Sequence, residues 1–167
     1  MTDRASSLLE ARRERLERIL GRRLAPPAES REPLSAEARG YLMGEGESLY
    51  WNDLEWEHIT DEEALEEGPI TQMTFPGFLA FVRGLLLYEV MPDSQAPANP
   101  RPQVVEELLR FLAGRVVELE QALAAPGDAE ADRLRTGLDV TSHLIDLVLY
   151  LIYDVGPEDI ERIEAAR

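Results

Sequence analysis

Apolar residues recur at intervals close to 3.6 along most of this chain, which is the pattern of amphipathic α-helices. The clearest stripe follows the proline-rich segment 92–102 and consists of Val105, Leu108, Leu109, Leu112, Val116, Leu119 and Leu123. Pro126 and Gly127 then predict a tight turn, and a last long helix is predicted over 129–155. A short connection between two long helices favours an antiparallel pair.

The first half of the chain carries two more helical patterns. Apolar spacing predicts an amphipathic helix over 6–24, and Ser35 opens a second pattern whose apolar face holds Leu42, Leu49 and Trp56. Because glycine weakens a helix interior, Gly44 and Gly46 leave open whether this second pattern is one helix or two short ones.

Two helices are predicted between these patterns and the long pair. Thr60 and Glu63 have the spacing of a capping box, which predicts a short acidic helix over 61–67. Thr74 is expected to cap the most apolar helix of the chain, which Pro92 ends. Alternating strand patterns are missing, so the fold is predicted to be all-α, a single bundle of about five or six helices.

The predicted organisation has three parts: an amphipathic N-terminal helix over 1–24, a proline-bearing linker over 25–34, and an acidic helical-bundle domain over 35–167. The apolar stripe of the first helix needs a partner, and the linker separates it from the bundle. We therefore expect residues 1–24 to be detachable from the fold and to offer a contact for homo-oligomers.

Composition limits the class of protein further. The 167 residues are 44% hydrophobic, enough for a buried core, and the absence of cysteine excludes disulfides, zinc–thiolate sites and thiol nucleophiles. The charged N-terminus does not resemble a signal peptide, and Arg83 and Glu89 interrupt the longest apolar segment, so no membrane span and a cytoplasmic location are predicted.

The charge is strongly acidic and unevenly distributed. The net charge is −16, and residues 25–167 hold ten arginines against 29 acids, whereas residues 1–24 hold seven arginines against four acids. Such a body repels phosphate backbones, so direct nucleic-acid binding is not expected, while a basic protein surface would be attracted. A weaker alternative is an acidic mimic of nucleic acid that occupies a basic site on another protein.

Both tryptophans of the chain lie in LYWNDLEWEH, residues 49–58, inside a stretch (45–68) with ten acids and no arginine. Large aromatic side chains bordered by charge are typical of docking surfaces. The predicted partner-binding residues are Tyr50, Trp51, Asp53, Glu57, Glu62, Glu63, Glu66 and Glu67. Helical spacing alone equally allows both tryptophan rings to lie in the core.

A metal site is the competing interpretation of the same stretch. Glu and His three residues apart on a helix can bind one metal ion, and paired helices of this kind form dinuclear iron or manganese centres. The candidate ligands are Glu55, His58, Glu89, Glu118, His143 and Asp146. In so acidic a chain the spacing also arises by chance, in which case His143 is an imidazole held by Asp139 or Asp146.

No motif supports an enzyme of another class. A calcium loop at Asp53 would need glycine where His58 stands, and serine-hydrolase elbows and phosphate-binding glycine loops are missing. The sequence is therefore interpreted as a non-enzymatic protein-interaction or regulatory subunit without a cofactor, whose acidic, aromatic-bearing surface binds a basic protein. The alternative is the iron or manganese bundle, with oxidase or metal-storage activity.

Overall fold

The computed structural model describes residues 4–25, 35–58, 75–87, 101–124 and 131–166. These residues form six helices and no strand, which confirms the predicted all-α bundle: α1 (Arg4–Leu20), α2 (Ala36–His58), α4 (Pro76–Leu87), α5 (Pro102–Ala124), α6 (Ala131–Ile152) and α7 (Pro157–Ala165). The predicted acidic helix over 61–67 lies outside the described residues, as do residues 26–34 of the predicted linker and the expected cap Thr74.

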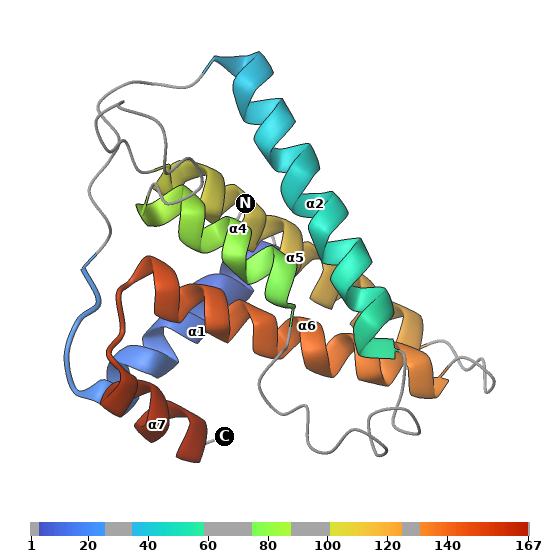
Figure 1. Ribbon diagram of the computed structural model, residues 1–167. Coiled ribbons are helices and arrows are strands. Elements are labelled where there is room, and N and C mark those ends of the chain that lie inside the picture. The colour runs from blue at the N-terminus through green and yellow to red at the C-terminus, as the bar shows by residue number, and fades with distance from the viewer. Residues whose placement is uncertain (1–3, 26–34, 59–74, 88–100, 125–130, 167) are drawn as a thin grey trace, which may run out of the picture.

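The centre of the bundle is the pair α5 and α6, which have the most extensive contact of any two helices. They run in opposite directions side by side (Figure 1), as their short connection predicts. Their facing sides are apolar and buried, with Val104, Leu108 and Leu112 of α5 and Leu144 and Ile145 of α6 fully excluded from solvent. Burial of these stripes stabilises the bundle more than helix propensity does.

The helices α2 and α4 cover the α5–α6 pair on one side, and α1 and α7 contact each other against the rest of the bundle. The N-terminal end of α2 projects beyond the other helices, as Figure 1 shows. Among the helices described, none is both long and apolar enough to cross a lipid bilayer.

The first helix is packed on the body of the same chain. Leu16, Leu20 and Leu24 are buried and belong to one apolar cluster with α5, α6 and α7. Arg12 of α1 also donates a hydrogen bond to the carbonyl oxygen of Ser142 in α6 at 3.0 Å. The apolar stripe that was expected to need another protomer is thus covered within the chain. Detachment of residues 1–24 from the fold stays a prediction, and these contacts do not favour it.

The second pattern forms one continuous helix from Ala36 to His58, so the option of two short helices is wrong. Its start is the predicted one, because the Ser35 hydroxyl oxygen accepts a hydrogen bond from the Ala38 N–H at 3.1 Å. Gly46 is buried where α2 meets α5, whereas Gly44 faces open space. Contact with α5 therefore compensates for the weak helix propensity of the middle of α2.

Candidate functional site

Two large apolar side chains are exposed in the described part of the chain, and both belong to α2. Tyr41 is 67% exposed and Trp51 is 45% exposed. Side chains spaced three or four residues apart share one side of a helix. The two rings accordingly lie on a solvent-exposed surface, called here the α2 outer face, made of Glu37, Tyr41, Glu45, Ser48, Trp51 and Glu55.

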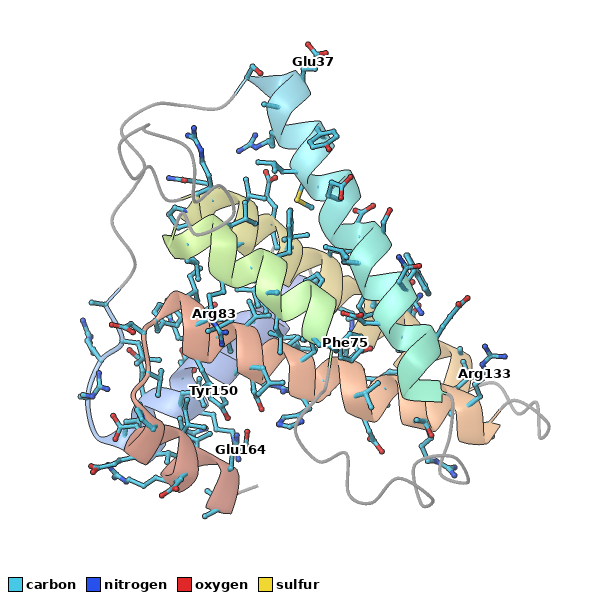
Figure 2. All side chains as sticks on the ribbon, viewed as in Figure 1. Glu37, Phe75, Arg83, Arg133, Tyr150 and Glu164 are labelled. Atoms are coloured by element: carbon cyan, nitrogen blue, oxygen red, sulfur yellow. The ribbon has the colours of Figure 1, made fainter. Side chains whose placement is uncertain are left out.

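Three carboxylates share this face of α2 with the two rings. Glu37, Glu45 and Glu55 are exposed, and Figure 2 shows Glu37 at the end of α2 that lies farthest from the other helices. Arg39, the arginine of this helix, lies 3.2 Å from Glu107 of α5 and so pairs with the body. The α2 outer face therefore combines two aromatic rings with a negative charge.

The opposite side of the same helix is part of the core. Tyr50 is fully buried, its hydroxyl lies 2.7 Å from the Thr141 hydroxyl oxygen of α6, and its ring stacks on Phe75 with centroids 5.6 Å apart. Tyr50 was predicted to bind a partner, and this prediction is wrong because the side chain has no free surface. Helix geometry explains the difference, since one residue step from Tyr50 to Trp51 turns the side chain by about 100°.

Asp53 was also predicted to bind a partner and is likewise a structural residue. It is 8% exposed, and its Oδ2 atom accepts a hydrogen bond from the Phe78 backbone N–H at 2.7 Å. Phe78 lies in the first turn of α4, where backbone N–H groups have no partner within the helix and attract negative charge. Asp53 thus caps α4 from the neighbouring helix.

Trp51 is held in place chiefly by Arg115, a residue that the sequence interpretation did not include. The guanidinium carbon of Arg115 lies 4.5 Å from the centroid of the Trp51 ring, and Arg115 Nη1 lies 2.6 Å from Glu118 Oε2. The Tyr50 ring contacts Trp51 edge-on at 5.2 Å. The tryptophan is therefore pre-oriented by a cation–π contact, although nearly half of it is exposed.

Beside Trp51 there is a groove between α2, α5 and α6, called here the Trp51 groove. It has a volume of about 340 Å³ and is lined by Trp51, Leu54, Glu55, Arg115, Leu119, Arg133, Leu134 and Gly137. Periodicity could have indicated that the leucines face inward. It could not indicate that arginines from two other helices meet beside Trp51.

The candidate metal ligands that the structure describes contact different partners and do not converge on one point. Asp146 Oδ1 lies 3.2 Å from Arg12 Nη1, Glu118 pairs with Arg115, and Glu55 lines the Trp51 groove. No group of three potential ligands comes together within the described residues. The side chain of His58 and all of Glu89 lie outside this part of the chain.

His143 was expected to be held by Asp139 or Asp146, and this expectation is wrong. Its Nε2 atom lies 3.0 Å from Oε1 of Glu164 in α7, and the Tyr150 hydroxyl donates to the same oxygen at 3.1 Å. Figure 2 shows Tyr150 and Glu164 facing each other across the α6–α7 contact. Sequence distance hid this partner, since Glu164 belongs to a different helix.

Comparison with protein-family models, curated proteins and solved structures found no match to this chain. The other predicted partner-binding residues lie outside the described part of the structure: the Glu57 side chain, Glu62, Glu63, Glu66 and Glu67.

Proposed function

We propose that this protein is a non-enzymatic interaction or regulatory subunit that binds a basic protein partner through the α2 outer face. The observation that carries the proposal is the exposure of Tyr41 and Trp51 on one face of one helix, between the carboxylates of Glu37, Glu45 and Glu55. Residues of the predicted partner site that point inward, Tyr50 and Asp53, have no part in it.

Physical chemistry supports an interaction role for such a face. Exposed aromatic rings supply a large apolar area with few rotatable bonds, so their burial against a partner costs little conformational entropy. Carboxylates beside them attract a basic surface and orient it during encounter. Trp51 is already oriented by Arg115, which lowers the ordering cost further.

Charge also determines which partner fits. The chain has a net charge of −16, so a second copy of the same face would be repelled, and an acidic partner likewise. A lysine- or arginine-rich protein surface with an apolar strip would match both the carboxylates and the rings. The proposed partner is therefore a basic protein and not another copy of this chain.

The test begins with the chain immobilised as bait and with identification of the proteins that it captures. A captured basic protein is then purified, and its association rate is measured at low and high salt. Screening should slow association as salt rises, because it removes the electrostatic attraction. The double variant Glu37→Arg/Glu45→Arg should slow association by roughly tenfold or more at low salt.

The matched control reverses two exposed acids on α1, in the variant Glu10→Arg/Glu14→Arg, which changes the net charge by the same amount. If both double variants slow association equally, the partner senses only the net charge and the α2 outer face is not the site. A second variant, Tyr41→Ser/Trp51→Ser, should speed dissociation of the complex. Unchanged dissociation would exclude the aromatic rings from the contact.

A further inference from the structure

We propose that the Trp51 groove is a binding site for a small, flat monocarboxylate, a ligand with an aromatic body and one negative charge. This binding site goes beyond the proposed docking function, which uses the outer face of α2 and does not depend on a ligand in the groove. The two share Trp51 and Glu55, but the groove adds residues of α5 and α6 that the α2 outer face does not contain.

The walls of the groove suit an apolar, planar group. Leu54 and Leu119 are 7% and 6% exposed and form an apolar lining together with Leu134 and the Trp51 ring. A volume of about 340 Å³ lies in the range of small-molecule sites. A flat aromatic body can pack on the tryptophan and the leucines at once, as ring contacts favour.

The two arginines of the groove differ in how their guanidinium groups are engaged by neighbouring side chains. Arg115 is stacked on Trp51 and paired with Glu118, so its orientation is fixed. Arg133 is exposed at the beginning of α6, as Figure 2 shows, and makes no ion pair with any residue that the structure describes. Its guanidinium can therefore hold a ligand carboxylate at the edge of the groove, with two parallel hydrogen bonds.

A second negative charge on the ligand would be unfavourable. Glu55 lines the same groove, Glu118 pairs with Arg115 beside it, and the whole chain is strongly acidic. For a dianion, repulsion by these carboxylates would offset the binding free energy that it gains from Arg133. The groove should thus prefer a monocarboxylate over both the neutral and the doubly charged forms of the same ring.

The experiment compares three probes on the full chain by isothermal titration calorimetry: naphthalene-2-carboxylate, naphthalene-2-carboxamide and naphthalene-2,6-dicarboxylate. The monocarboxylate should bind more tightly than either other probe by roughly threefold to tenfold, because a carboxylate–guanidinium pair at an exposed site contributes only a small free energy of binding. Binding should also shift the NMR signal of the Trp51 indole N–H, which the variant Trp51→Phe identifies.

The matched variants are Arg133→Gln and Arg83→Gln, which each remove one exposed arginine, the first in the groove and the second on α4. Figure 2 labels both and shows them far apart. Arg133→Gln should abolish the preference for the monocarboxylate, and Arg83→Gln should leave it intact. Equal binding of acid and amide, an unshifted Trp51 signal, or an Arg133→Gln variant that still prefers the monocarboxylate would each overturn the proposal.

Discussion

Gly46 of α2 and Leu108 of α5 determine how closely these two helices approach. A methyl carbon on Gly46 would lie 2.6 Å from Cδ2 of Leu108, which is itself fully buried. Such a distance is too short for two carbon atoms, so the helices can touch here only because residue 46 lacks a side chain. Gly44, two residues earlier, has no such neighbour and serves as a control.

Alanine substitutions at these two glycines should have different effects on stability. Gly44→Ala should raise the free energy of unfolding by roughly 0.5–1 kcal/mol, because alanine is the better helix residue. Gly46→Ala should be about 1–3 kcal/mol less stable than Gly44→Ala, because the extra methyl overfills the contact with Leu108. Urea denaturation of both variants measures the difference, and equal stabilisation would show that α2 does not contact α5 at Gly46.

The buried hydroxyl pair of Tyr50 and Thr141 should behave as a coupled unit. Tyr50→Phe and Thr141→Val each leave one buried hydroxyl without this partner, so each should lower the free energy of unfolding by about 1–3 kcal/mol. The double variant removes both hydroxyl groups and should cost less than the sum of the two single losses. A double-mutant cycle measured by denaturation gives the coupling, and strictly additive losses would contradict it.

Asp53 should contribute to stability as the cap of α4. Asp53→Ala removes the acceptor for the Phe78 N–H and should lower the free energy of unfolding by about 0.5–2 kcal/mol. Asn52→Ala, at the exposed neighbouring position, should change it by less than about 0.5 kcal/mol. If Asp53→Ala left stability unchanged but weakened partner binding, the original docking role of Asp53 would be restored.

The N-terminal helix should behave as part of the core. Leu16 is fully buried against the rest of the bundle, so Leu16→Ala should lower the free energy of unfolding by about 2–5 kcal/mol. Deletion of residues 1–24 should reduce the cooperativity of thermal unfolding, because it exposes the apolar surface that α1 covers. A truncated chain with an unchanged, cooperative transition would instead support the separable segment predicted from the sequence.

The sequence by itself determined five of the six described helices, whereas α7 (Pro157–Ala165) was not among the predicted ones. The apolar spacing of 102–124 gives α5 its buried side, Ser35 starts α2 where its hydroxyl can cap the helix, and the missing strand patterns exclude a sheet. All three are local effects, because propensity, capping and periodicity act within a few residues of the chain. Such effects can be read without knowing which helices meet.

Only the tertiary structure decided which side of each helix is free. Tyr50 and Trp51 are adjacent in an acidic stretch, yet the first is buried against Thr141 and the second is nearly half exposed beside Arg115. The Trp51 groove likewise joins residues from three helices that are far apart in the sequence. The physical reason is that helix periodicity gives only the direction of each side chain relative to its neighbours on the same helix. Burial depends instead on how the whole helix is rotated against its partners. Packing of the complete core determines that rotation.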